Sequence, residues 1–74
     1  MDEKSTIRRL GDTLRARRSE LGFSQESFAD SIGMHRAYYS SIERGARNIT
    51  VLTLIRITDG LDTKAAAILK ASDI

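Results

Sequence analysis

Cysteine and proline are both absent from this chain of 74 residues. Without cysteine, neither a disulfide nor a thiolate metal site can stabilise the fold, and we expect a cytoplasmic protein. With no proline, no long polar tract and 41% hydrophobic residues, the composition is that of a compact helical protein. The length suits a single domain spanning residues 1–74, with no linker and no internal repeat.

Long apolar runs are missing as well. No stretch approaches the roughly 20 apolar residues that cross a bilayer, and the first four residues lack the apolar segment of a signal peptide. We therefore expect a protein that is neither exported nor associated with a membrane.

The groups that carry catalysis are scarce. His35 is the only histidine, so no catalytic pair and no metal cluster can be built around it. There is no glycine-rich phosphate loop, and Ser40 and Ser41 have no neighbouring base that would activate them as nucleophiles. The sequence predicts a protein that is not an enzyme and that uses no metal, no cofactor and no small-molecule ligand.

Helical periodicity is the main feature that the chain does have. Gly22, Gly45 and Gly60 are placed to end helices, and Ser24 and Thr50 are placed to begin them. The spacing of apolar residues predicts an all-α fold of five helices, at about 6–21, 25–32, 35–44, 51–60 and 63–70.

Residues 24–45 are the most informative part of the chain. They predict two short helices joined by a tight turn, with Ala29 where the helices approach each other, Gly33 in the turn and Ile42 pointing into the core. This is the layout of a helix-turn-helix that reads DNA.

The second helix of this segment has two different faces. Tyr39 and Ile42 share the inner side, whereas the outer side carries small and polar residues beside arginines and fits a major groove about 12 Å wide. Nine of the twelve basic residues in the chain are arginine, whose planar fork suits phosphates and guanine edges. The residues expected to contact bases are Arg36, Ala37, Ser40 and Ser41. The residues expected to contact phosphates are Gln25, Tyr38, Arg44, Arg47 and Asn48.

Several of these positions have a second interpretation. Arg36 can be a phosphate contact or a mobile surface arginine, Gln25 can be a solvated residue at a helix start, and Tyr38 can be partly buried against the preceding helix. Glu43 would repel DNA if it faced outward. We therefore expect Glu43 to face inward and to pair with an arginine of the first helix, Arg17 or Arg18.

The pattern resembles the lambda-repressor-like helix-turn-helix family of phage repressors and Cro proteins. The resemblance covers about residues 7–69 and is carried by the run from Ser24 to Asp30, by Gly33-Met34, and by Ile42 and Gly45. Within this family the chain is similar to the controller proteins of restriction-modification systems, because of its size, Arg36, Tyr38 and residues 42–48. Family members often carry better helix caps at the positions of His35 and Lys64, so both caps are expected to be weak here.

The resemblance implies a transcriptional regulator that binds a pseudo-palindromic operator in double-stranded DNA as a homodimer. We expect this regulator to read DNA through residues 24–45. We expect it to dimerise through about residues 50–74, because that part of the chain offers more apolar positions than packing against the first helix needs. The expected interface residues are Leu61, Ala65, Ile68 and Leu69. The size also fits a phage repressor, or an antitoxin that neutralises a partner protein and binds DNA secondarily. RNA is less favoured, because no platform of aromatic residues lies on the outer face.

Overall fold

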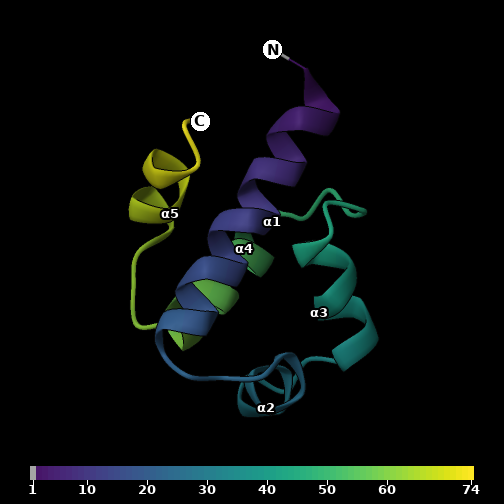
Figure 1. Cartoon of the computed structure of the whole chain (residues 1–74), viewed down its shortest axis with the longest axis vertical. Helices are drawn as coiled ribbons and strands as arrows, with labels where there is room; N and C mark the ends of the chain where they lie inside the picture. The colour runs from purple at the N-terminus through teal and green to yellow at the C-terminus, as the bar shows by residue number, and fades with distance from the viewer. Residues whose placement is uncertain (1) are drawn as a thin grey trace.

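The computed structural model describes residues 2–74 and folds them into five α-helices with no strand in that range. The helices are α1 (Glu3–Glu20), α2 (Gln25–Ser31), α3 (Arg36–Glu43), α4 (Val51–Gly60) and α5 (Ala65–Ala71) (Figure 1). The predicted all-α fold of five helices is confirmed. α1 begins earlier than expected, because the N–H and the hydroxyl of Thr6 both donate to the carbonyl of Asp2.

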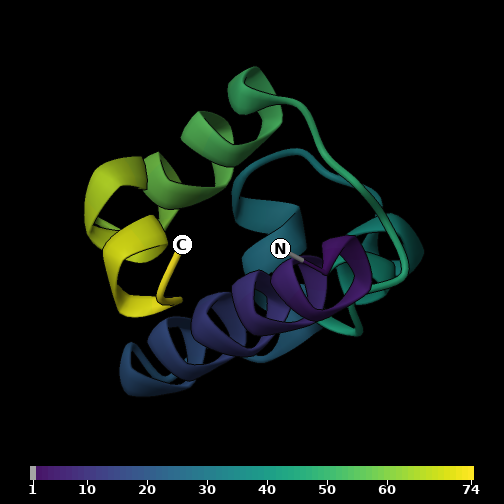
Figure 2. The same cartoon turned by 90° about the horizontal axis from the view of Figure 1, so that it is seen from above.

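The longest helix, α1, separates the helix-turn-helix from the end of the chain. α3 packs against α1 and α2, whereas α5 packs against α1 and α4. In Figure 1, α3 and α5 accordingly lie on opposite sides of α1. The view in Figure 2 places α1 and the beginning of α4 at opposite edges of the molecule. α3 and α5 are therefore held on different sides of α1, while α4 contacts the turn of the helix-turn-helix through Arg56.

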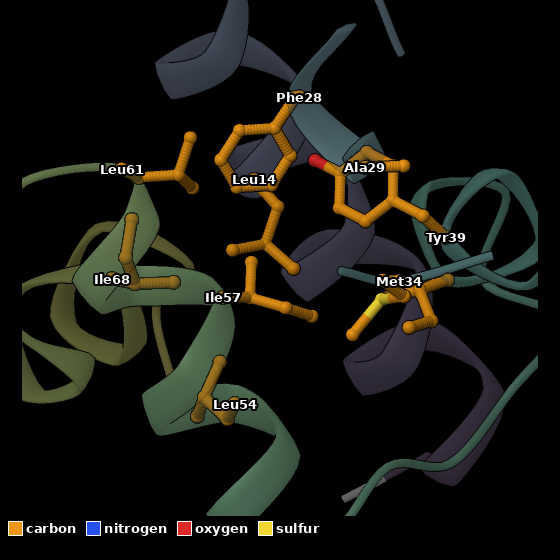
Figure 3. Close-up of a cluster of buried hydrophobic side chains, with 10 residues drawn as sticks. Leu14, Phe28, Ala29, Met34, Tyr39, Leu54, Ile57, Leu61 and Ile68 are labelled. Atoms are coloured by element: carbon orange, nitrogen blue, oxygen red, sulfur yellow. The ribbon is translucent and has the colours of Figure 1, made fainter. Parts of the chain in front are cut away.

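The core receives apolar side chains from all five helices and from the turn before α3. The rings of Phe28 and Tyr39 are its largest members, with ring centroids 5.0 Å apart. Ala29 is fully buried and Ile42 nearly so, as the spacing predicts. The buried apolar residues, nearly all labelled in Figure 3, are Leu14, Phe28, Ala29, Met34, Tyr39, Ile42, Leu54, Ile57, Leu61 and Ile68.

Two of the four residues expected at the dimer interface lie in this core instead. Leu61 is fully buried and Ile68 is only 4% exposed, and both point toward Leu14 and Ile57 in Figure 3. Ala65 and Leu69 are half-buried and pack against the same core. The expectation that Leu61 and Ile68 lie at an interface is thus wrong, because the single core of so small a domain already uses them.

The turn of the helix-turn-helix has the backbone geometry that its glycine predicts. Gly33 has a φ of 65°, and the N–H groups of Gly33 and Met34 donate to the carbonyls of Asp30 and Ala29. These two hydrogen bonds close α2 in a Schellman motif and reverse the chain within a few residues. α3 can therefore begin at Arg36, directly after the turn.

α4 ends at Gly60 as expected, but not because Gly60 adopts a left-handed conformation. Gly60 is the last helical residue, but the left-handed conformation lies at Asp62, which has a φ of 54°. Gly60 is required for space, since a Cβ at this position would collide with the side chain of Ile32 and lie 3.2 Å from the ring of Phe28. The N–H of Thr63 then closes α4 on the carbonyl of Thr58, which delays α5 to Ala65.

Hydrogen bonds at the helix starts agree with the sequence. The hydroxyl of Ser24 accepts from the N–H of Ser27 at 3.0 Å, and the N–H of Ser24 donates back to the hydroxyl of Ser27. Thr50 caps α4 in the same manner through the N–H of Thr53. His35 and Lys64 make no side-chain cap, as expected. The start of α3 is therefore positioned by tertiary contacts rather than by its own cap.

A separate tertiary contact fixes the end of α3, where α1 approaches it closely at Gly11. A Cβ at this position would lie 2.5 Å from the carbonyl oxygen of Glu43 and 2.7 Å from that of Ile42. Both atoms belong to the backbone, so neither can rotate away. Only glycine allows the two helices to pack at this distance.

We expect Gly11→Ala to lower the free energy of unfolding by about 2 kcal/mol, because the added methyl group forces α1 and α3 apart. The result would run against helix propensity, which favours alanine over glycine by about 1 kcal/mol. Urea unfolding measures the change, and the exposed Ser19→Ala in the same helix is the control. A Gly11→Ala protein as stable as the wild type would show that the helices are not in backbone contact.

Candidate nucleic-acid interface

The exposed face of α3 carries most of the residues expected to contact bases. Arg36 and Ala37 are exposed in the first turn, and Ser40 is half-buried one turn later. Arg44 follows Ser40 on the same face and donates to its hydroxyl at 3.1 Å. Because Tyr39 and Ile42 are buried on the other side, α3 presents a shallow ridge of small side chains between two arginines.

Ser41 does not belong to this ridge, and its expected outward position is wrong. It is only 7% exposed. Its hydroxyl donates to the carbonyl of Tyr38 at 2.6 Å and accepts from Nε of Arg47 at 3.3 Å. Ser41 lies at the edge of the exposed face, where the loop after α3 folds back over it. Helical spacing alone does not reveal this cover, because the loop has no periodicity.

Arg47 and Tyr38 form a pair beside the ridge. The guanidinium carbon of Arg47 lies 5.3 Å from the centroid of the Tyr38 ring, within the range of a cation–π contact. Tyr38 is half-buried and packs against the core, which agrees with the second interpretation of this residue as a partly buried side chain. The ring and Ser41 together orient Arg47, while Arg47 and the neighbouring Asn48 remain exposed.

Glu43 joins the helix-turn-helix to α1. Its carboxylate is buried and lies 2.7 Å from Nε and 3.1 Å from Nη2 of Arg18, a two-pronged ion pair. The expected inward pairing of Glu43 is confirmed, with Arg18 as its partner. The side-chain amide of Gln25 also donates to Glu43, at 2.9 Å. Gln25 is thus held by an internal contact at the start of α2, and one carboxylate ties together α1, α2 and α3.

The protonation states in this cluster follow from its contacts. Burial by itself raises the pKa of Glu43, but the hydrogen bonds from Arg18 and Gln25 outweigh burial and hold that pKa below its ordinary value. The hydrogen bond to Glu43 also raises the pKa of Arg18. Burial raises the pKa of the neighbouring Tyr39 hydroxyl above its usual range. The cluster is therefore an ionised pair beside a neutral phenol at neutral pH.

Three arginines bind backbone carbonyls, a role that the sequence does not predict. Nη2 of Arg56 lies 2.7 Å from the carbonyls of both Ile32 and Gly33, in the turn before α3. Arg17 donates to the carbonyl of Leu61 at the end of α4, and Arg18 donates to the carbonyl of Phe23. For Arg56 a signal existed, since it is the only charged residue in the first eight positions of a largely apolar helix.

Two further features are absent from the part of the chain that the structure describes. No helix there is long and apolar enough to cross a membrane. Nor do residues 2–74 contain a group of three or more side chains suited to hold a metal ion.

The fold and its ridge define a class of DNA-reading domain, and comparison with known proteins identifies it. The chain belongs to the helix-turn-helix family, whose sequence model matches residues 14–68. The predicted likeness to restriction-modification controller proteins is also confirmed. Control protein C.MunI of a Mycoplasma species is 48% identical over 54 residues, which cover 72% of this chain and 73% of that protein.

Solved structures of controller proteins have the same fold. C.AhdI from Aeromonas hydrophila superimposes with a TM-score of 0.80 and 31% identity, over 84% of this chain and 94% of that protein. The controller protein C.Esp1396I was solved as a tetramer in complex with its natural operator of 35 base pairs. It superimposes with a TM-score of 0.83 and 28% identity, over 92% of this chain and 90% of that protein.

Proposed function

We propose that this protein is a transcriptional regulator that binds a pseudo-palindromic DNA operator as a homodimer, and that its job is that of a restriction-modification controller. The observation that carries the proposal is the exposed ridge of α3, held in place by the buried Arg18–Glu43 pair. The likeness to C.MunI and C.Esp1396I supports it. Binding, and not catalysis, is the activity that such a surface performs.

The proposed contacts divide into base readout and backbone attachment. Arg36, at the beginning of α3, makes a bidentate contact to guanine, while Ala37 and Ser40 are small enough to let the helix approach base edges. Ser41 takes no part, because it is buried. The phosphate contacts come from residues around the ridge, namely Gln25, Tyr38, Arg44, Arg47 and Asn48.

Selection of bound sites from a random pool of DNA duplexes tests the function, and Arg36→Ala tests the reading residue. We expect the selected sites to be inverted repeats. Arg36→Ala is expected to cost about 1–3 kcal/mol of specific binding and to relax the preference at one base pair in each half-site. Binding to random duplex is expected to change much less. A pool without any enriched sequence would contradict the function, and equal losses on operator and random duplex would make Arg36 a phosphate contact.

The proposed dimer uses an apolar surface on α4 in place of the buried Leu61 and Ile68, while the expected contacts of Ala65 and Leu69 stay predictions. Val51 and Leu52 are 70% and 79% exposed, and Ile55 follows one turn later on the same helix. A groove of about 210 Å³ beside Val51 is lined largely by apolar side chains, including Leu69 and Ile74. We call Val51, Leu52 and Ile55 the α4 patch.

A second copy of the chain is the proposed occupant of the α4 patch. The patch is apolar and uncharged, so two copies related by a twofold axis present complementary surfaces to each other. Its residues are separate from the ridge of α3, so dimerisation and DNA binding can occur together. Pairing two ridges also explains how so small a domain reads an operator, since the free energies of two half-sites combine.

A further inference from the structure

A row of charged side chains runs along the exposed side of α1 and has no part in the contacts described so far. Arg8, Asp12 and Arg15 are spaced by four and three residues, so they lie on one face of the helix. All three are exposed. No ion pair within residues 2–74 engages either arginine of this row.

The close packing at two glycines brings this row against the end of α3. A Cβ at Gly45 would lie 2.8 Å from the Cα of Arg8, so the backbone of α1 touches the loop directly after α3. One turn further along α1, Gly11 makes the equally close approach to Glu43. The side chain of Arg8 therefore leaves α1 next to Arg44, at the edge of the α3 ridge.

A hollow of about 300 Å³ lies between these elements. Its lining residues come from α1, from the start of α2 and from the end of α3, and they are Arg8, Asp12, Arg15, Gln25, Glu43 and Arg44. The charge of Glu43 is balanced by Arg18 beneath the hollow. The remaining charges are three arginines against the single carboxylate of Asp12, so the hollow attracts anions.

We propose that this hollow binds the phosphodiester backbone of the operator, with Arg8 and Arg15 of α1 acting together with Arg44. The inference rests on the proposed function and extends the DNA surface from the helix-turn-helix onto α1. Arginine forms forked hydrogen bonds to phosphate oxygens. Arg8 and Arg15 are separated by about 10 Å along the helix axis, so the row suits a line of phosphates better than one small anion.

The salt dependence of operator binding tests the proposal. The slope of log K against log salt is negative, and removing one phosphate contact reduces its magnitude by about 0.9. We expect Arg8→Gln and Arg15→Gln each to reduce that magnitude by about 0.9 and the double variant to reduce it by about twice as much, with sequence preference unchanged. Asp12→Asn is expected to tighten binding, because it removes the one repulsive charge. Lys70→Gln on α5 is the control, since it removes an exposed charge far from α3.

The possible results distinguish a failure of the α1 phosphate site from a failure of the proposed DNA-binding function. If the wild type binds its operator and the slopes of Arg8→Gln and Arg15→Gln match that of Lys70→Gln, the α1 site is overturned and the function stands. If the wild type binds no operator, both are overturned. Inorganic phosphate is compared with chloride at equal ionic strength. If millimolar phosphate binds the wild type but not Arg8→Gln or Arg15→Gln, while both variants keep the operator affinity and salt slope of the wild type, the hollow is a site for a free anion and the proposal is wrong.

Discussion

Replacing Leu52 with aspartate is expected to convert the protein from a dimer into a monomer and to lower its affinity for the operator by orders of magnitude. Leu52 is the most exposed large apolar residue described in the chain, at 79%, and stands at the centre of the α4 patch. In a twofold contact, an aspartate at position 52 would be buried without a cationic partner. It would face either the same aspartate or the apolar α4 patch of the second copy. The fold itself should be unaffected, because the side chain packs little against its own domain.

Sedimentation equilibrium at micromolar concentration measures the first effect, and titration with operator duplex measures the second. Leu21→Asp is the matched control, because Leu21 is an exposed apolar residue at the end of α1, outside the α4 patch. Leu69→Asp probes the groove beside the patch, whereas Ile68→Asp would disrupt the core and test only folding. If Leu52→Asp remained a dimer with normal affinity, the interface would lie elsewhere.

Removing the carboxylate of Glu43 is expected to cost about 3–5 kcal/mol of stability, the largest change we predict for any single residue. Glu43→Ala leaves the guanidinium of Arg18 buried without its anion, and it also removes the acceptor of Gln25. A domain of this size is stable by only about 5–10 kcal/mol, so much of the chain would unfold on mild heating. Thermal and urea unfolding measure the loss.

A double variant distinguishes the stability lost by leaving Arg18 unpaired from the stability that the ion pair itself contributes. Arg18→Met combined with Glu43→Leu replaces both charges by apolar side chains and should regain most of the stability lost in Glu43→Ala. If the restored protein also bound the operator normally, the pair would serve stability alone. If it were stable but bound weakly, the pair would be needed to orient α3 against α1. Equal stability of Glu43→Ala and wild type would contradict the burial of the pair.

The same pair makes stability depend on pH in the acid range. The pKa of Glu43 is lower in the folded protein than its ordinary value of 4.5, so the folded state binds fewer protons than the unfolded chain. This contribution is therefore fully present above about pH 4.5 and is lost as the pH falls from there through the depressed pKa of the folded state. Urea unfolding between pH 7 and pH 3 should show a smaller pH dependence in the double variant than in the wild type.

Local signals in the sequence determined the helices and the turn. Gly22, Gly33 and Gly45 adopt positive φ, and Ser24 and Thr50 cap the following helices, as their chemistry requires. These contacts join residues within about five positions of one another, so both partners are visible in the local sequence. The helix-turn-helix and the exposed face of α3, apart from Ser41, followed from these signals and from helical spacing.

The tertiary structure alone decided which apolar residues are exposed. α4 carries apolar side chains at five of its first seven positions, so periodicity indicates a helix with apolar residues on several sides without showing which side meets the core. Packing against α5 placed Leu61 and Ile68 inside and left Val51 and Leu52 outside.

The sequence shows where the arginines are, but the tertiary structure decides which partner each of them contacts. A run of arginines in α1 predicts a basic helix, but only the approach of distant segments shows that Arg17 reaches the end of α4 and Arg18 reaches Glu43. Arg8 and Arg15 line the hollow beside α3 as a result of the same packing. The composition determined that the protein carries many guanidinium groups. The contacts of Arg17 and Arg18 with Leu61 and Glu43 join residues 25 or more positions apart, and no local pattern encodes such pairs.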